Sequence, residues 1–337
     1  MRLRRSVSPA AFRRVAWWAW AAQIGIVLTG AAVRLTGSGL GCTDWPGCTE
    51  DRLVPEWGFH HWVEFGNRLL TFAVITTAAV ATVAARRRQP YRRSAFGLSA
   101  VLVAGIVAQA LIGALLVVLE LDPRLTVLHF ATSVVLITAA VALVHVSAHD
   151  GGLSGNSLVG LDNAAGDAGH HDAAVAPHSA VARLTTALGI AAGVVVSTGT
   201  VVTGSGPHGG DERADRFGFA LRSVTRLHSG AMWLFLALLV ALMVLVARSP
   251  RADALLRPNL HALVGLTVAQ GVLGYLQYAL GVPAGLVALH VLGSTLVWSA
   301  VVALVLKVRA ATAAVASSSR REPTGSGERA RPVLSEK

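Results

Sequence analysis

The chain has 337 residues, of which 53% are hydrophobic and only 14% are charged, and its mean hydropathy is +0.58. Soluble domains carry roughly 25% charged residues, so this composition indicates an integral membrane protein. The net charge of +11 would suggest a nucleic-acid partner for a soluble protein, but the arginines lie between apolar stretches and no basic groove with interleaved aromatic residues is present. Two cysteines exclude a disulfide-rich scaffold and a four-cysteine metal site, and they allow one disulfide.

The first apolar run covers residues 15–33 and follows a basic N-terminal arm. A cleaved signal peptide has such an arm, but this run approaches the roughly 20 residues that span a bilayer and has no clear small-x-small cleavage site. We therefore predict a membrane helix here. Further runs of spanning length cover residues 62–85, 94–119, 124–147, 181–203, 226–247, 257–280 and 284–308. Backbone polar groups in hydrocarbon must be satisfied within the segment, so eight transmembrane helices are predicted.

The connecting segments that are rich in basic residues all fall on one side of the predicted membrane. The positive-inside rule makes that side the cytoplasm, so both termini are predicted to be cytoplasmic in a multi-pass protein of the cell membrane. The opposite loops are balanced or acidic, and residues 204–225 carry three arginines against three acids. The basic residues of the predicted cytoplasmic segments are Arg2, Arg4, Arg5, Arg13, Arg14, Arg86, Arg87, Arg88, Arg92, Arg93, Arg248, Arg251, Arg257, Lys307 and Arg309.

Two segments outside the spans lack hydrophobic periodicity. Residues 148–180 are rich in Gly, Ala, Asp and His and are predicted to form a flexible cytoplasmic linker. Residues 310–337 are predicted to form a disordered cytoplasmic tail. The chain is thus divided into an N-terminal unit at 1–147, the linker, a C-terminal unit at 181–309 and the tail. Metal binding remains an alternative role for the linker histidines His149, His170, His171 and His178.

The two units share an internal repeat. A shift of 161 positions places Ala108-Gln109, Gly113 and His129 on Ala269-Gln270, Gly274 and His290. The segment Thr36-Gly37-Ser38-Gly39 recurs as Thr203-Gly204-Ser205-Gly206 at a slightly different shift. The predicted fold is therefore all-α, with eight transmembrane helices arranged as two pseudo-symmetric four-helix bundles.

The repeat also aligns polar residues inside the spans. Asn67, His129, His228 and His290 each lie two to six residues past the predicted start of a helix that enters from the extracytoplasmic side. They should share one depth near that face. Facing helices of a bundle can hold a cofactor between such side chains.

A histidine on an apolar face is often only a hydrogen-bonded core residue, but inside a membrane span an ionisable group is costly and by default functional. His228 and His290 are predicted to be the axial ligands of a heme iron, because facing imidazoles suit a low-spin heme that transfers electrons. Met232 and Met243, the only internal methionines, are poor competitors. The sequence has no Cys-x-x-Cys-His, so the heme would be held without covalent attachment.

Glu64 lies about one helical turn before Asn67 and is followed by Arg68. One interpretation is an interfacial carboxylate paired with Arg68. The other is a general base, or a charge that stabilises a cationic intermediate in a pocket of low dielectric. His60 and His61 precede Glu64 by about a turn, and either they reach the same pocket or they cap the helix at the interface.

Cys42 and Cys48 lie six positions apart in the first outer loop. Disulfides persist on the oxidising side of the membrane, and Pro46-Gly47 can supply the turn that so short a loop needs. We predict a disulfide, structural or redox-active, with two free thiols as the alternative. The corresponding loop of the second half has no cysteine.

At these residues the sequence resembles the heme A synthase family in its bacterial form, membrane enzymes that convert heme O to heme A for terminal oxidases. The resemblance covers the eight predicted helices and leaves out the linker and the tail. Its most specific parts are the outer loop from Thr36 to Cys48, the segment Glu64-Phe65-Gly66-Asn67-Arg68 and the three helix histidines.

The resemblance implies a heme b on His228 and His290 in the C-terminal unit and the substrate heme O in the N-terminal unit. A methyl group of the substrate is oxidised in steps to a formyl group, with water as the oxygen source and electrons leaving through the enzyme. The family's cysteine pair falls on Cys42 and Cys48, and its catalytic glutamate falls on Glu64.

One position departs from the family pattern. Many members have a histidine where this chain has Asn67, so the N-terminal unit keeps one helix histidine, His129, as the expected ligand of the substrate iron. The site then has an open coordination position or is completed by His60 or His61. Asn67, Arg68, His60 and His61 are accordingly assigned to the substrate heme site.

The main alternative is a b-type cytochrome subunit that relays electrons to or from quinone, which would explain the histidines but neither Glu64 nor the cysteine pair. A repeat-built transporter would have broken helices and a site near the midplane. The expected partners are heme O and the lipid bilayer. Candidate partners are a heme O synthase, a terminal oxidase assembly and a second copy of the chain, and no nucleic acid is expected.

Overall fold

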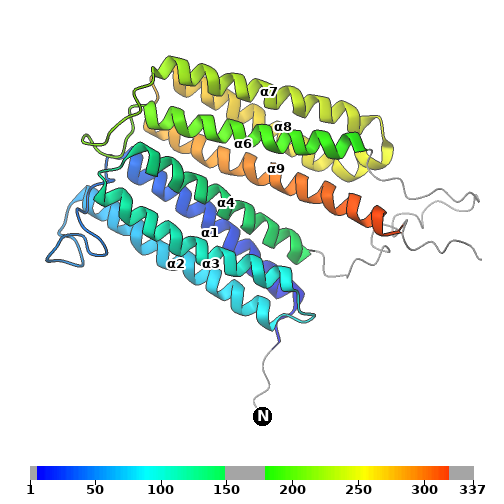
Figure 1. Ribbon diagram of the computed structural model, residues 1–337, viewed down its shortest axis with the longest axis horizontal. Helices are drawn as coiled ribbons and strands as arrows, with labels where there is room; N and C mark the ends of the chain where they lie inside the picture. The colour runs from blue at the N-terminus through cyan, green and yellow to red at the C-terminus, as the bar shows by residue number, and fades with distance from the viewer. Residues whose placement is uncertain (1–5, 149–178, 319–337) are drawn as a thin grey trace, which may run out of the picture.

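The computed structural model describes residues 6–148 and 179–318, and this part of the chain folds into long helices (Figure 1). Eight of them are long and apolar enough to cross a membrane, which confirms the predicted class. The predicted linker histidines lie outside the described residues. The helices are α1 (Pro9–Leu35), α2 (Phe59–Arg87), α3 (Arg93–Val118), α4 (Pro123–Ala148), α6 (Ser179–Ser205), α7 (Leu221–Ala247), α8 (Pro250–Ala279) and α9 (Ala284–Ser318).

Two helix boundaries differ from the predicted spans in ways that matter later. Helix α2 begins at Phe59 instead of residue 62, so His60 and His61 lie in its first turn. Helix α9 continues to Ser318, so residues 310–318 of the predicted tail are helical. The charges of Lys307 and Arg309 end the apolar run, but the alanine-rich sequence that follows them still favours a helix.

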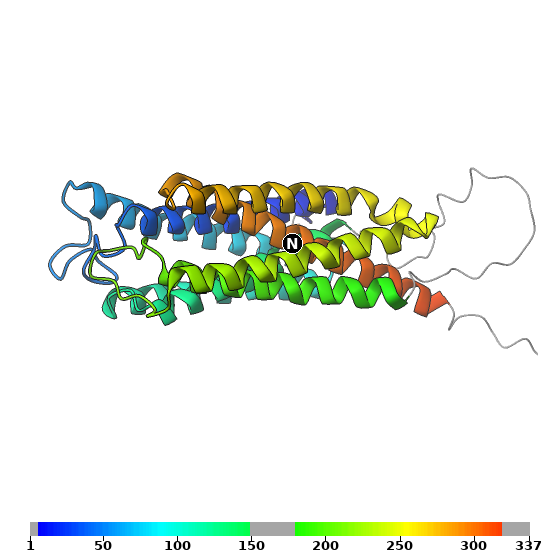
Figure 2. The ribbon, with the colours of Figure 1, turned by 90° about the horizontal axis from the view of Figure 1, so that it is seen from above.

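The helices form two four-helix units that lie side by side (Figure 1). Helices α1 to α4 make the N-terminal unit and α6 to α9 make the C-terminal unit, and α9 packs on both α1 and α4. All helices run along one long axis, which the view from above shows as well (Figure 2). The loops at 36–58 and 206–220 lie at one end, and the basic loops at 88–92 and 248–249 lie at the other (Figure 1).

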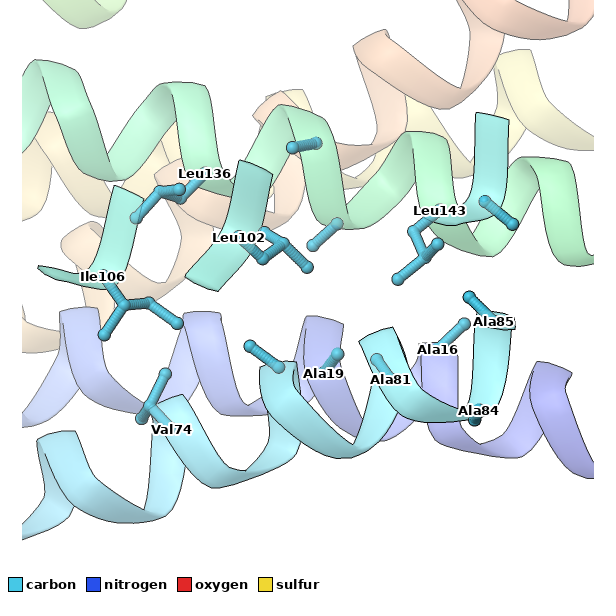
Figure 3. Packing of buried hydrophobic residues seen from close by; sticks show 14 of the residues in the cluster. Ala16, Ala19, Val74, Ala81, Ala84, Ala85, Leu102, Ile106, Leu136 and Leu143 are labelled. Atoms are coloured by element: carbon cyan, nitrogen blue, oxygen red, sulfur yellow. The ribbon is translucent and has the colours of Figure 1, made fainter. Parts of the chain in front are cut away.

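Small side chains allow the helices of the N-terminal unit to approach closely. Nine of the fifteen residues in its buried cluster are alanines, contributed by all four helices (Figure 3). In a bilayer there is little hydrophobic force between helices, so close packing of small residues supplies much of the association. The corresponding cluster of the C-terminal unit has only three alanines among fifteen and is filled by Leu, Val and Phe.

The interface between the units combines apolar packing with two indole hydrogen bonds. Trp20 Nε1 donates to Ser299 Oγ at 3.2 Å, and Trp298 Nε1 donates to Thr138 Oγ1 at 2.9 Å. Each bond joins a helix of one unit to a helix of the other. An indole N–H buried in this region needs such an acceptor, so the two bonds favour one register between the units. The surrounding apolar residues are Ile24, Ile137, Val141 and Val302.

The repeat seen in the sequence is also present in backbone geometry. In the α3–α4 turn, Glu120 and Leu121 have φ of 47° and 64°, and in the α8–α9 turn the equivalent Gly281 and Val282 have φ of 77° and 62°. Leu121 N donates to the carbonyl of Leu116, and Val282 N donates to the carbonyl of Gln277. Left-handed backbone is unfavourable for Leu and Val, so its recurrence at matched positions indicates one turn design used twice.

The two units are joined at the end that carries the long loops. Gly39 N donates to the carbonyl of Gly210 at 2.7 Å, and Arg34 Nη2 donates to the carbonyl of Thr203 at 2.6 Å. Gly39 and Thr203 belong to the Thr-Gly-Ser-Gly segments of the two units. Their partners, Gly210 and Arg34, lie close to the equivalent segment of the other unit. The segment therefore has a structural role at the interface in addition to ending its helix.

The two ends of the bundle should lie on opposite sides of the membrane. Reporter fusions after Arg88 and after Glu50 are expected to give opposite locations, because these residues lie at opposite ends of α2 and the basic end should be cytoplasmic. An alkaline phosphatase and green fluorescent protein fusion pair measures this. Equal signals at the two positions would contradict the topology.

Candidate functional site

The four aligned polar residues lie at nearly the same distance along their helices. Asn67, His129, His228 and His290 are six to eight residues after the first residues of α2, α4, α7 and α9, and these four helices all start at the end with the long loops (Figure 1). At about 1.5 Å per residue, this corresponds to a depth of about 9–12 Å. The sequence predicted positions two to six residues past the helix starts, so the observed layer is somewhat deeper and more uniform than predicted.

In the C-terminal unit, His228 and His290 face one another. Their ring centroids are 6.4 Å apart and the ring planes are inclined by 69°. Both side chains are only partly exposed. The structure thus brings together the two histidines that the repeat assigned to one unit.

Hydrogen bonds fix the orientation of His228. Its Nδ1 lies 3.1 Å from the carbonyl oxygen of Val195, to which it can donate, and 3.1 Å from Thr198 Oγ1. A proton on Nδ1 leaves Nε2 as the basic nitrogen. Histidines that bind a metal commonly donate their other ring N–H to a carbonyl in this way.

The pair fits a heme iron in spacing and in chemistry. A metal–imidazole bond of about 2 Å, with the ring centroid about 1 Å behind the nitrogen, puts two axial imidazoles roughly 6 Å apart between centroids. The observed separation is close to this value. Within the described chain, no hydrogen bond uses Nε2 of His228 or His290, so both nitrogens remain available.

Glycines make room for these rings. A Cβ atom on Gly199 would lie 3.1 Å from Cε1 of His228, and one on Gly274 would lie 3.1 Å from Cε1 of His290. These contacts are tighter than ordinary van der Waals packing. The glycines therefore allow α6 and α8 to pass directly behind the imidazoles.

The N-terminal unit repeats this framework with different side chains. Thr29 Oγ1 donates to Asn67 Oδ1 at 2.8 Å, just as Thr198 contacts His228 in the other unit. Gln109 Nε2 donates to the carbonyl of His129 at 2.9 Å, and the equivalent Gln270 donates to the carbonyl of His290 at 2.6 Å. Asn67 thus occupies the structural position of His228.

An ion pair between buried Glu64 and partly buried Arg68 holds the outer loop against α2. Glu64, which is 5% exposed, accepts from Arg68 Nη2 at 2.5 Å and from the backbone N of Cys42 at 2.7 Å. Arg68 Nη1 also donates to the carbonyls of Asp44 and Gly47, at 2.8 and 2.7 Å. Each charge is therefore bonded to its partner and to the loop, which is what a buried pair needs to be stable.

The loop held by this ion pair contains the disulfide. Cys42 and Cys48 are bonded, with an S–S distance of 1.99 Å, and both are fully buried. This confirms the predicted disulfide and excludes the two free thiols. Trp62 and Phe65 of α2 pack against the two cysteines.

His60 and His61 contact the outer loop. His60 Nδ1 lies 2.9 Å from Ser38 Oγ, and His61 Nδ1 contacts the carbonyl oxygen of Gly41. Both side chains are exposed, and a Cβ on Gly41 would collide with the backbone of His60. These contacts join the two rings to the outer loop, not to the unpaired N–H groups at the start of α2, and they leave the ring Nε2 atoms unused.

The sequence interpretation missed the threonines that contact the polar layer. Thr29-Gly30 and Thr198-Gly199 are the same dipeptide in equivalent parts of α1 and α6. The distance from this dipeptide to the Thr-Gly-Ser-Gly segment is two residues longer in α1 than in α6. A comparison at one fixed shift therefore does not align the two dipeptides. A local alignment of the two helices that allowed a gap would have found the match.

These features define a class: an all-helical, multi-pass membrane protein made of two copies of a four-helix unit, with a polar layer near one end and a disulfide-bonded loop over one copy. Within that class, the profile of the COX15-CtaA family, described as "Cytochrome oxidase assembly protein", matches residues 13–208, more than half of the chain. The chain belongs to this family of cytochrome oxidase assembly proteins.

Curated relatives are consistent with this assignment. The chain is 43% identical over 107 residues to "Heme A synthase" of Geobacillus thermodenitrificans, covering 31% of this chain and 32% of that protein. It is 35% identical over 135 residues to "Heme A synthase" of Lysinibacillus sphaericus, covering 39% of this chain and 44% of that protein. The chain thus spans less than half the length of the curated relatives it matches. The resemblance found in the sequence is confirmed.

Removing the Arg68 side chain should loosen the disulfide loop. In Arg68→Ala, the carbonyls of Asp44 and Gly47 lose their donor, so the disulfide should be reduced at a roughly tenfold lower dithiothreitol concentration, a shift of the size expected for the loss of hydrogen bonds to a charged group. Thiol alkylation and mass spectrometry measure the reduction.

The matched control is Arg52→Ala, which removes an exposed ion pair with Glu56 in the same loop. This variant should behave as wild type. Equal sensitivity of the Arg68 and Arg52 variants would show that the ion pair does not protect the disulfide. Two cysteines that react before any reductant is added to the unmodified protein would contradict the bond itself.

Proposed function

We propose that this protein is a bacterial heme A synthase of the cell membrane, which oxidises a methyl group of heme O to a formyl group. The family assignment and the names of the relatives support the proposal. Both termini would be cytoplasmic, and the polar layer would lie towards the extracytoplasmic face, as the arginine distribution predicts. A heme O synthase would deliver the substrate, and a terminal oxidase assembly would receive the product.

The observation that carries the proposal is the facing histidine pair of the C-terminal unit. His228 and His290 would hold a heme b through Nε2, with His228 oriented by Val195 and Thr198. A bound heme b would supply a one-electron acceptor that moves electrons away from the substrate. The protein's contribution is to orient the imidazoles and to separate the site from water.

The N-terminal unit would bind the substrate heme O. His129 is the proposed iron ligand, and Asn67 takes the place of a second imidazole, so one coordination position remains open. The Nδ1 of His129 is buried and has no hydrogen-bond partner in the described structure, which means that the ring is not locked by another residue. Arg68, His60 and His61 would border the site on the side of the outer loop.

Glu64 is the proposed catalytic carboxylate. Water must add an oxygen atom to the methyl carbon while protons and electrons leave, and a carboxylate can accept a proton from that water or stabilise a developing positive charge. Glu64 also bonds to Cys42 and Arg68, so the same group would connect the disulfide loop to the chemistry. A subunit that only relays electrons needs neither the carboxylate nor the loop.

Loss of either C-terminal histidine should remove the heme b. His228→Ala or His290→Ala should abolish the low-spin heme b spectrum of the purified protein, because each variant lacks one of two axial ligands. His129→Ala should keep most of that spectrum, since His129 belongs to the other unit. Equal loss in all three variants would contradict the assignment of one heme b to the C-terminal unit.

Glu64→Gln should affect the reaction more than heme binding. The amide keeps the size of the side chain but is not a proton acceptor, so formation of heme A should fall roughly 100-fold or more. The variant should keep its heme b and accumulate heme O or an alcohol intermediate. Mass spectrometry of extracted hemes measures all of these species.

Arg68→Ala is the matched control because it breaks the same ion pair and leaves the carboxylate in place. If Glu64 acts only by holding the loop, Arg68→Ala should lose at least as much heme A as Glu64→Gln, because it also removes the donors to Asp44 and Gly47. If Glu64 acts on the substrate, Glu64→Gln should lose clearly more. Wild-type levels of heme A in Glu64→Gln would refute the catalytic role, and heme b alone in the unmodified protein would favour the electron relay.

A further inference from the structure

The side of the C-terminal unit formed by α7 and α8 carries a polar cluster that the proposed chemistry does not use. Tyr275 Oη lies 2.6 Å from Ser229 Oγ and accepts a hydrogen bond from Trp233 Nε1 at 2.9 Å. The aromatic side chains are 50% and 56% exposed on the outside of the helices. In a membrane protein this surface faces lipid, where a hydroxyl group without a partner is unfavourable.

The cluster is directly connected to the histidine pair. On α7, Ser229 directly follows His228. On α8, Tyr275 directly follows Gly274, which packs against the ring of His290 from α9. No equivalent exists in the N-terminal unit, where the repeat places Arg68, Phe72 and Ala114 at the positions of Ser229, Trp233 and Tyr275. The cluster therefore accompanies only the unit that is proposed to hold heme b.

An aromatic belt at the membrane interface is the simplest alternative, but it does not explain the geometry. In a belt, the polar atoms of Tyr and Trp point to the headgroups and water. Here, the indole N–H of Trp233 on α7 donates to the hydroxyl oxygen of Tyr275 on α8, so the two polar groups bond to each other and not to the headgroups. Trp233 also lies twelve residues from the start of α7, about 18 Å along the helix.

We propose that Ser229, Trp233 and Tyr275 form a binding site for the head group of a membrane quinone, which accepts the electrons released by the reaction. The Tyr275 hydroxyl can turn from Ser229 to a quinone carbonyl oxygen while Trp233 Nε1 holds its oxygen atom. The exposed aromatic rings offer flat surfaces to a quinone ring that arrives from the lipid. The cluster contains no charged side chain, which disfavours a phospholipid phosphate as the ligand.

The electron balance closes with a quinone. This inference rests on the proposed function: oxidation of a methyl group to an alcohol by water releases two electrons and two protons, and oxidation of the alcohol to the aldehyde releases two more of each. A quinone takes up two electrons and two protons to become a quinol. Each oxidation step thus consumes one quinone.

Photolabelling with a short-chain azido-ubiquinone tests the site without requiring turnover. The label should attach to the halves of α7 and α8 nearest the long loops, in protein with or without heme. Tyr275→Phe removes the hydroxyl but keeps the ring, and should reduce labelling roughly three- to tenfold, as expected for the loss of a hydrogen bond. The control is Tyr278→Phe, one turn away at a similarly exposed tyrosine whose side chain has no hydrogen bond within the described chain, and it should label as wild type.

A second measurement follows the electrons in protein that holds heme b. Reoxidation of the reduced heme by decylubiquinone should slow in Tyr275→Phe and Trp233→Phe by a similar factor, while reoxidation by ferricyanide stays unchanged. Labelling elsewhere, or equal labelling and reoxidation in wild type and Tyr275→Phe, would overturn the quinone site. Protein without heme b would instead contradict the proposed function, while the labelling would still decide the site.

Discussion

A polar side chain inside a membrane span needs a partner, and this constraint organises the functional half of the bundle. Glu64 can be buried and Arg68 partly buried because each also bonds to the outer loop. His228 is held by a carbonyl and a hydroxyl of α6. The buried Nδ1 atoms of His129 and His290, in contrast, have no partner within the described chain. Satisfied polar groups hold the scaffold together, whereas the rings of His129 and His290 are not fixed by a hydrogen bond to another residue of the described chain.

The two halves share one arrangement of four helices, and they differ in the outer loops, in the packing of their cores and in the side chains of the polar layer. The left-handed turns at Leu121 and Val282 and the bonds from Gln109 and Gln270 are common to the two units. One unit then has a facing pair of histidines, and the other has an asparagine, a buried carboxylate and a disulfide. A symmetric frame thus carries two different sets of polar side chains at the same depth, which agrees with the proposed function, in which two hemes are bound and treated differently.

The sequence predicted the helices and the polar layer well, because long apolar runs and a fixed repeat shift carry strong signals. It did not predict the contacts between Arg68 and the carbonyls of Asp44 and Gly47, since the path of an irregular loop depends on tertiary contacts. The extension of α9 to Ser318 was missed because membrane spans are recognised by hydropathy, whereas a helix can continue past the apolar region. The cluster at Tyr275 was missed for another reason: it joins two helices at residues without a sequence motif.

The contact between Gly39 and Gly210 has a consequence for how the halves depend on each other. Leu121 of the α3–α4 turn lies so close to both glycines that a Cβ on Gly39 would come within 2.8 Å of its side chain and one on Gly210 within 3.0 Å. Three segments from two halves therefore share one small space. A larger side chain at any of these positions would be felt by both halves at once. Although each half contains its own buried cluster, the two are not interchangeable modules, and a half transplanted from a relative would need its matching partner at this junction.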